Sequence, residues 1–326
     1  MLLFVSSRYL GNKIAQALIT IFIVLCVNFF LFRIMPGDPL SMLMRNPRAS
    51  QQAIQKAKEL YGLDQSLPAQ FGRYLQDLVK LDFGVSFMFK KPVVEVIGGK
   101  IGPTLLLLGV SELIAIILGI YLGIVAASHR GRIVDVGAIS LSLLLYSLPT
   151  FLLGMVLILV FSVYWGLFPS VGMVTAAAKF SSWWRQSLDL LAHLFLPAMT
   201  LALTLIGEYG MLMRSSLIEV LSEDFIVTAR AKGLSEREVI HKHGYPNALL
   251  PVVTAISINL GLTIAGAIQV ETVFSWPGIG RLMYDALNNR DYPLLQGIFL
   301  LVCICVIVAN LLSDLLYMVL DPRVKS

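Results

Sequence analysis

The stretch SEDFIVTARAKGLSEREVIHKHGYPNALLP, from Ser222 to Pro251, is polar, basic and interrupted by glycines, yet apolar runs long enough to cross a bilayer lie on both sides of it. The 326-residue chain is 57% hydrophobic and only 14% charged, with a mean hydropathy of +0.80, whereas an ordinary soluble domain has about 25% charged residues. The composition predicts an integral membrane protein. The net charge of +5 fits basic residues at the cytoplasmic ends of spans, so we do not expect nucleic-acid binding.

Six segments reach the roughly 20 apolar residues that a helix needs to cross the hydrocarbon core. We therefore predict an all-α integral membrane protein with about six transmembrane helices. Pro149 and Pro197 are expected to kink the third and fourth helices. The segments are Ile14–Phe32, Pro103–Ala127, Val134–Val163, Leu190–Met213, Leu249–Val270 and Leu294–Leu320.

The chain divides into three regions along its length. Residues 1–34 are predicted to be an uncleaved transmembrane anchor, residues 35–102 a small helical extracytoplasmic subdomain, and residues 103–326 a five-helix core with a polar cytoplasmic loop at 214–248. The short segments on the same side of the membrane as the polar loop hold more lysine and arginine than the short loops on the opposite side. This asymmetry predicts that the polar loop and both termini are cytoplasmic.

The extracytoplasmic subdomain is predicted to contain short helices at Gln51–Tyr61 and from Pro68 to about Lys80, with a third possible at Pro92–Gly98. Two roles remain open for this subdomain: a packed cap on the bundle, or a docking surface for an external partner.

The polar loop is predicted to form two short helices joined at a glycine. Ser222 is placed to cap the first helix and Gly233 to end it after about ten residues. Ser235-Glu236-Arg237-Glu238 fits a capping box for the second helix, which Gly244 and Pro246 are expected to end. Helices this short are marginal alone in water, so a partner groove would stabilise them. The alternative is an ordinary cytoplasmic loop, which is also polar, basic and partly helical.

The order of motifs decides between these alternatives. The chain resembles bacterial and archaeal ABC importer permeases, specifically the B-type subunit of the dipeptide, oligopeptide and nickel group. Residues that carry the resemblance run along nearly the whole chain: Pro36-Gly37-Asp38-Pro39, Gly62-Leu63-Asp64, Asp82-Phe83-Gly84, Asp224 to Leu234, Pro246 to Pro251, Glu271 to Gly280, Arg290-Asp291-Tyr292-Pro293 and Asp321-Pro322-Arg323.

The resemblance implies that the first loop helix is a coupling helix seated in a cleft of a separate ATP-hydrolysing subunit. In the wider family a glutamate stands at the position of Val227, so the role of that carboxylate does not carry over to this chain. The implied coupling residues are Asp224, Phe225, Thr228, Ala229, Arg230, Ala231, Lys232, Gly233 and Leu234.

The resemblance also implies the partners: a second permease subunit forming a heterodimer, two ATP-binding subunits, an extracytoplasmic solute-binding protein and membrane lipid in the inner (cytoplasmic) membrane. Peptides are the leading substrate class, with nickel chelates and oligosaccharides open. We expect no cofactor, metal or catalytic site on this chain, and ATP with Mg²⁺ on the partner subunits. Consistently, the lookalike Gly98-Gly99-Lys100 lacks the upstream glycine of a phosphate-binding loop.

Polar residues inside the predicted spans are candidates for the translocation path, because ionisable and amide groups at bilayer depth are costly. These candidates are Glu112, Asn259 and Gln269, and hydrogen bonding between helices is the alternative reading. Gly119 and Gly123 show the spacing of small residues that lets helices approach closely.

The loop that follows the fifth span is rich in aromatic residues and glycine. We predict an external gate or docking element there, with an interfacial cap as the simpler alternative; its candidate residues are Phe274, Trp276 and Pro277.

A different class of function stays open from sequence alone. An ion-coupled secondary carrier would work without an ATPase, but such carriers often show internal repeats and paired intramembrane charges. The sequence shows no clear repeat and one deep carboxylate, Glu112, which favours the importer permease.

Overall fold

The computed structural model describes residues 7–34, 65–176, 178 and 182–320, apart from the side chains of residues 7–10, 33–34, 260–266 and 312–320. Within these residues the chain is almost entirely helical and contains no strand, only the isolated bridge Val85–Pro92. In chain order the helices are α1 (Ser7–Ile34), α4 (Leu67–Val79), α5 (Val93–Ser128), α6 (Ile133–Ser147), α7 (Thr150–Leu157), η1 (Ile158–Tyr164), α8 (Trp183–Val220), α9 (Asp224–Ala231), α10 (Glu236–Glu238), η2 (Val239–Gly244), α11 (Tyr245–Val273), α12 (Ile279–Asn288) and α13 (Tyr292–Leu320).

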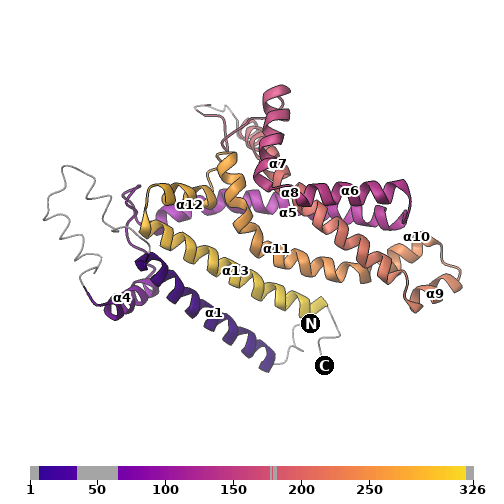
Figure 1. Ribbon diagram of the computed structural model, residues 1–326, viewed down its shortest axis with the longest axis horizontal. Helices are drawn as coiled ribbons and strands as arrows, with labels where there is room; N and C mark the ends of the chain where they lie inside the picture. The colour runs from indigo at the N-terminus through magenta and orange to yellow at the C-terminus, as the bar shows by residue number, and fades with distance from the viewer. Residues whose placement is uncertain (1–6, 35–64, 177, 179–181, 321–326) are drawn as a thin grey trace.

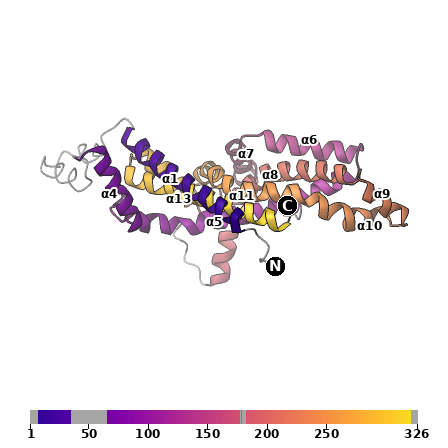
Figure 2. The same cartoon turned by 90° about the horizontal axis from the view of Figure 1, so that it is seen from below.

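The long helices lie along the molecule, with α4 near one end and α9 and α10 at the other (Figures 1 and 2). Four of them are long and apolar enough to cross a membrane, namely α1, α5, α8 and α13, and a fifth span is reached if the bent pair formed by α6 and α7–η1 counts as one. The remaining predicted span, Leu249–Val270, lies within α11. The predicted class of an all-α membrane protein is confirmed.

The third predicted span is not one kinked helix. The chain breaks at Leu148 and Pro149, and the axis of Thr150–Tyr164 is turned by 103° from that of α6. Leu148 is extended, with ψ 132°, the conformation that a following proline favours. The kink predicted at Pro149 is therefore confirmed in position, but it is a break between two helices and not a bend within one, and Figure 1 shows α7 standing across the direction of α6.

The predicted extracytoplasmic helices have different outcomes. The helix expected from Pro68 is confirmed as α4, which has a proline in its first turn. Pro92–Gly98 is not a separate helix, because Val93 begins α5, which continues through Pro103. The helix predicted at Gln51–Tyr61 lies outside the described residues.

Close approach of α5 to α8 builds the centre of the bundle. A Cβ on Gly123 would lie 2.6 Å from the Cβ of Met213 and 2.7 Å from the carbonyl oxygen of Gly210. A Cβ on Gly119 would lie 2.8 Å from the Cβ of Tyr209. The predicted packing role of Gly119 and Gly123 is confirmed, since any larger side chain would push the two helices apart.

An ion pair joins α6 to the same end of α8. The guanidinium of Arg214 donates from Nε to Oδ1 of Asp135 at 2.5 Å and from Nη2 to Oδ2 at 2.8 Å, and the Gly131 amide donates to Oδ2 at 2.9 Å. The Asp135 side chain is only 3% exposed. A buried carboxylate is tolerated here because three donors satisfy it.

Arg214→Ala is expected to lower the free energy of unfolding by about 2 kcal/mol, because it leaves Asp135 buried with one remaining donor. Thermal denaturation of the detergent-purified protein measures the effect. The matched control is Arg237→Ala, which removes an exposed arginine and should leave the midpoint unchanged. Equal midpoints for the two variants would contradict this role for the ion pair.

Candidate functional site

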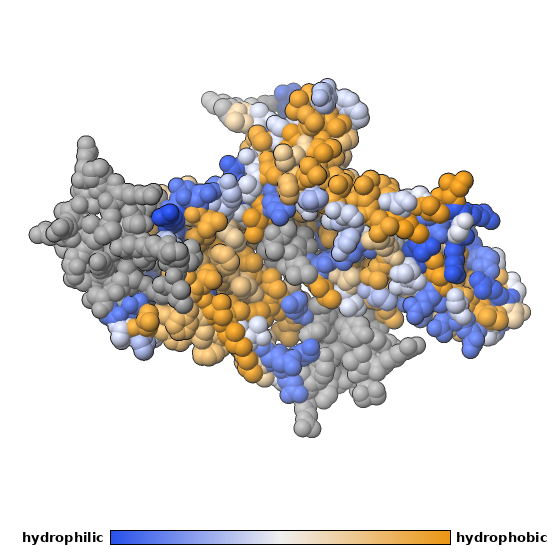
Figure 3. All heavy atoms as spheres, in the orientation of Figure 1, coloured by the Kyte–Doolittle hydropathy of each residue, from blue (hydrophilic) through white to orange (hydrophobic). Residues whose placement is uncertain are grey.

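The first loop helix, α9, lies at one end of the molecule, where hydrophilic atoms gather (Figure 3). Ile226 and Ala229 are buried against Val239 with Leu221 and Leu234 beside them. The other predicted coupling residues of this segment are exposed, apart from Leu234, which is half-buried. The exposed set is Asp224, Phe225, Thr228, Arg230, Ala231, Lys232 and Gly233.

Helical spacing separates α9 into two faces. Ile226 and Ala229 lie on the face toward the bundle, and Val227, Thr228 and Ala231 lie on the opposite one. Val227 is 59% exposed. The outward face therefore consists of short side chains, with the exposed Asp224 in its first turn and no glutamate, and Ala229 lies on the inward face.

Local interactions fix the shape of the loop. Gly233 takes φ +83° directly after α9, and its amide donates to the carbonyl of Arg230 at 2.9 Å, as predicted for a helix-ending glycine. The predicted cap at Ser222 is wrong, because its hydroxyl donates back to the carbonyl of Ile218 at 3.0 Å and Glu223 occupies the cap position.

The capping box of the second helix is confirmed. The Glu238 amide donates to the Ser235 hydroxyl oxygen at 3.4 Å, and the Ser235 amide donates to the Glu238 carboxylate at 3.2 Å. Hydrogen bonds from Lys242 and from the Ser235 side chain and amide lower the pKa of Glu238 to about 2, so the box stays ionised at neutral pH. A second ion pair, Arg230–Glu236 at 2.8 Å, joins α9 to α10.

The second helix does not end at Gly244 and Pro246. It widens into η2 and runs directly into α11, where Pro246 lies in the first turn and needs no hydrogen bond from its nitrogen. Gly244 is buried against the end of α8, where a Cβ would lie 3.0 Å from Leu217 Cδ1 and 3.3 Å from Leu221 Cδ2. The loop is thus continuous with a predicted membrane span.

Two of the three predicted path residues meet in one buried cluster. Tyr209 on α8 donates to Oε1 of Glu112 on α5 at 2.6 Å, and the amide of Asn259 on α11 donates to the Tyr209 oxygen at 3.4 Å. Glu112 is 5% exposed and Tyr209 is fully buried. Gln269 is not part of this cluster, because it lies ten residues further along α11 and is exposed.

The predicted gate or docking residues Phe274 and Trp276 are the core of a tight turn rather than a surface that a partner could touch. Trp276 is fully buried, and its indole N–H donates to the carbonyl of Pro103 at 2.9 Å. Phe274 is buried beside it, and its carbonyl accepts from the Gly172 amide at 2.8 Å. Pro277 is half-buried.

A fully buried carboxylate holds this turn to α5. The Thr104 hydroxyl donates to Oε1 of Glu271 at 2.7 Å and accepts from the Ile279 amide at 2.8 Å, and the Arg281 amide donates to Oε2 of Glu271 at 3.1 Å. Gly278 leaves space for the carboxylate, because a Cβ there would lie within 2.4 Å of all three carboxyl atoms. The motif from Glu271 to Gly280 is therefore a structural joint between α11, α12 and α5.

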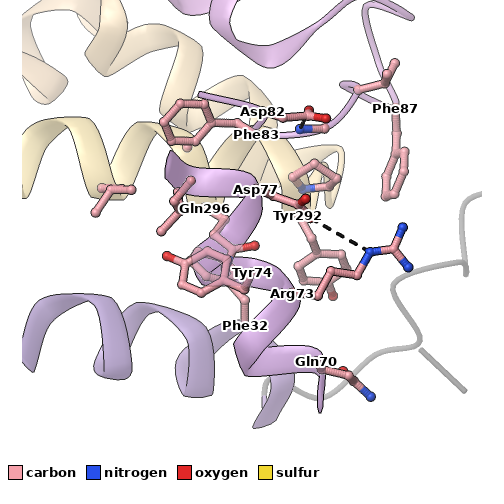
Figure 4. Close-up of a pocket in the computed structure, with 16 residues that line it drawn as sticks. Phe32, Gln70, Arg73, Tyr74, Asp77, Asp82, Phe83, Phe87, Tyr292 and Gln296 are labelled. Atoms are coloured by element: carbon pink, nitrogen blue, oxygen red, sulfur yellow. Dashed lines mark hydrogen bonds and ion pairs between the residues drawn. The ribbon is translucent and has the colours of Figure 1, made fainter. Parts of the chain in front are cut away.

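A cavity of about 370 Å³ lies at the α4 end of the molecule, between α1, α4, the segment at 82–87 and the start of α13. Figure 4 shows Phe32, Tyr74 and Tyr292 on its walls, and the Arg73–Asp77 ion pair at 3.9 Å beside them. Its lining mixes aromatic and polar side chains.

Several buried polar residues were missed from the sequence. Asp291 accepts from the Ser86 hydroxyl at 2.5 Å and from the Met88 amide at 2.9 Å, which ties the segment before α5 to α13. Tyr209 and Thr104 likewise bind partners far away in the chain. The sequence motifs of the family resemblance include Asp291 and Glu271, so these two residues could have been singled out from the sequence. They do not include Tyr209 or Thr104, which no sequence pattern indicated.

Membrane-length helices, a buried polar cluster and an exposed helical loop at one end together define an integral membrane protein with a polar surface for a partner to contact. Residues 119–326 match the model of the family described as binding-protein-dependent transport system inner membrane component. Residues 1–108 match the model of the N-terminal region of such membrane components. The chain belongs to this family of inner membrane transport components.

Relatives match along almost the whole chain. The glutathione transport system permease protein GsiC of Escherichia coli (strain K12) is 39% identical over 318 residues, which cover 98% of this chain and 99% of that protein. A putative peptide permease protein of Brucella suis biovar 1 is 40% identical over 323 residues, again 98% and 99% of the two chains.

Solved structures share the fold at low identity. The MetNI methionine ABC transporter in an inward facing conformation gives a TM-score of 0.56 at 17% identity, covering 70% of this chain and 97% of that one. An amino acid ABC transporter gives a TM-score of 0.52 at 12% identity, covering 69% and 94%. These similarities establish a common fold for the permease core.

Proposed function

We propose that this chain is one permease subunit of an ATP-driven importer that takes up peptides delivered by a solute-binding protein. The observation that carries the proposal is the similarity of 39–40% along 98% of the chain to permeases named for glutathione, which is a tripeptide, and for peptides. The substrate class thus comes from relatives, and the coupling route comes from the geometry of the loop.

The proposed assembly contains a second permease subunit, two ATP-binding subunits and an extracytoplasmic solute-binding protein in the inner membrane. The end that carries α9 and α10 faces the cytoplasm together with both termini, and α4 faces the other side. ATP and Mg²⁺ are bound by the ATP-binding subunits, which perform the hydrolysis. The phosphate-loop lookalike Gly98-Gly99-Lys100 supports this division of labour, because it forms part of α5 and cannot wrap a phosphate.

The outward face of α9 indicates the chemistry of the groove that receives it. Val227 and Ala231 are one helical turn apart and exposed, so the partner groove presents an apolar floor beneath them. Arg230 is held by Glu236 at the flank. A groove of this kind needs no basic residue opposite position 227.

Val227→Glu is therefore expected to weaken retention of the ATP-binding subunits by about tenfold, because it places an unpaired carboxylate on an apolar surface. Val227→Ile is the matched control and should retain them within about twofold. Quantitative co-purification in mild detergent measures both variants. Undiminished retention of the glutamate variant would show that the groove carries a basic partner at this position.

Reconstitution into liposomes tests the proposed function itself. The chain with its co-purifying permease and ATP-binding subunits, supplied with loaded binding protein, should import a tripeptide only when ATP is present. The chain alone should move no peptide under an ion gradient. Uptake by the chain alone, without ATP, would identify a secondary carrier and overturn the proposal.

A further inference from the structure

One oxygen of the buried Glu112 carboxyl has no hydrogen-bond partner among the described residues. Oε1 accepts from Tyr209, whereas Oε2 is fully buried and vacant. A buried acceptor left unpaired keeps its full desolvation cost, so such groups are few in native proteins. The vacant oxygen lies in the same three-residue cluster as the amide donor of Asn259.

The two helices that hold Glu112 and Tyr209 behave as one body. At Gly119 and Gly123 the backbone of α5 approaches α8 so closely that a Cβ would not fit, and Tyr209 itself packs with Ala115, Ala202 and other aliphatic residues. The Tyr209–Glu112 hydrogen bond, at 2.6 Å, is correspondingly short. Both groups therefore keep their relative positions when neighbouring helices move.

Helix α11 brings Asn259 to this pair as the third element of the cluster. Glu271 and the Trp276 turn fasten its far end to α5, and its near end, where Ala248 and Val252 pack against Met213 and Leu217 of α8, is continuous through η2 with the exposed loop. Local π-helical turns of the η2 type often occur at functional sites. Gly261 and Gly266 lie between Asn259 and the fastened end, where glycine lowers the cost of bending. The Asn259–Tyr209 hydrogen bond, at 3.4 Å, is longer and therefore weaker than the Tyr209–Glu112 hydrogen bond, at 2.6 Å.

We propose that Tyr209 is a positioning residue in a hydrogen-bonded switch. The Asn259 amide donates to the Tyr209 hydroxyl in the conformation described and to Oε2 of Glu112 in the other transport state. Tyr209 continues to donate to Oε1 in both states. The Asn259 amide therefore satisfies the tyrosine oxygen in the described state and the second carboxyl oxygen in the other. The switch rests on the proposed function, because it needs a protein that alternates between two states.

The two members of the rigid pair have opposite predicted effects. Tyr209→Phe removes the acceptor used in the described state and leaves the Glu112 acceptor of the other state, so it favours the other state. Glu112→Gln keeps a carbonyl for Tyr209 but replaces the vacant acceptor with an amide that cannot accept, so it favours the described state. Each shift should be about tenfold in population, because each variant removes one hydrogen-bond acceptor from one of the two states.

Pulsed electron resonance on the assembled transporter in nanodiscs measures these populations. Spin labels are placed at two exposed positions, Ser215 on α8 and Asn247 on α11, and distance distributions are recorded with and without ATP. The background replaces the chain's three cysteines with alanine: Cys26, Cys303 and Cys305. The matched control is Tyr121→Phe, which removes the hydroxyl of an exposed tyrosine on α5 and should leave the distribution unchanged.

Opposite shifts for Tyr209→Phe and Glu112→Gln are the expected result. An unchanged distribution in either variant, or shifts in the same direction, would overturn the switch, since simple loosening of the core does not reverse sign. Failure of the proposed function is separately visible: ATP would then leave the distribution of the unmodified cluster unchanged. If ATP changes that distribution but the variants do not, only the switch is wrong.

Discussion

Gly233→Val should reduce both peptide uptake and the ATPase stimulation caused by loaded binding protein by about tenfold, while the chain still inserts and assembles. Gly233 has φ +83°, where an L residue with a Cβ costs about 1–2 kcal/mol and a β-branched one costs more. A Cβ at this position meets no atom within 4 Å, so the cost comes from the backbone alone. A shift of that size changes the loop population by about tenfold.

Gly233→Asn is the control for this prediction, because asparagine tolerates the left-handed conformation. It should retain stimulation and uptake within about twofold. Both variants are compared in proteoliposomes at equal amounts of assembled transporter. Normal stimulation in the valine variant would remove the glycine hinge from the coupling route, and equal loss in both variants would indicate a side-chain clash instead of a backbone effect.

Gly280→Ala should lower the free energy of unfolding by about 3 kcal/mol. Its Cβ would lie 2.5 Å from the Cα and 2.9 Å from the nitrogen of Ile268, and the backbone of α11 cannot yield as a flexible side chain does. Relief requires α12 to move away from α11, which also breaks the Arg281 amide bond to Glu271 at 3.1 Å. The joint between α11, α12 and α5 would then lose its central contact.

Gly99→Ala provides the matched control, because a Cβ there meets nothing within 4 Å and alanine favours a helix. Thermal denaturation in detergent should show a clear drop in midpoint for Gly280→Ala and no drop for Gly99→Ala. Equal midpoints would mean that the close approach of α12 to α11 contributes little to stability.

Local patterns in the sequence predicted much of the fold and of the loop. Length and hydropathy located the spans, and the capping box at Ser235–Glu238 formed as expected because every group in it lies within four residues. The same local reasoning failed at Pro246, which begins a helix instead of ending one. Proline has no N–H and therefore cannot donate the usual helical hydrogen bond. Pro246 is tolerated because it lies in the first turn of α11, directly after the wider η2 turn.

Long-range contacts were beyond such patterns. Tyr209 reads as one aromatic residue in an apolar run, and only the packing of three helices brings it between Glu112 and Asn259. Trp276 was expected in an external gate or docking element because the loop around it is rich in aromatic residues and glycine. It is instead fully buried, and its indole N–H donates to the carbonyl of Pro103, 173 residues away. Partners separated by this distance leave no periodic signal in the sequence.

Site-specific photo-cross-linking in the purified assembly tests most directly whether α9 delivers the energy of ATP hydrolysis to this chain. A benzophenone side chain at Thr228, on the outward face of α9, should give an adduct with an ATP-binding subunit, whereas the same group at Val79, which is 86% exposed on α4, should give none. Absence of the Thr228 adduct from an assembly that contains the ATP-binding subunits, or an adduct with them from Val79, would contradict the proposed coupling and orientation.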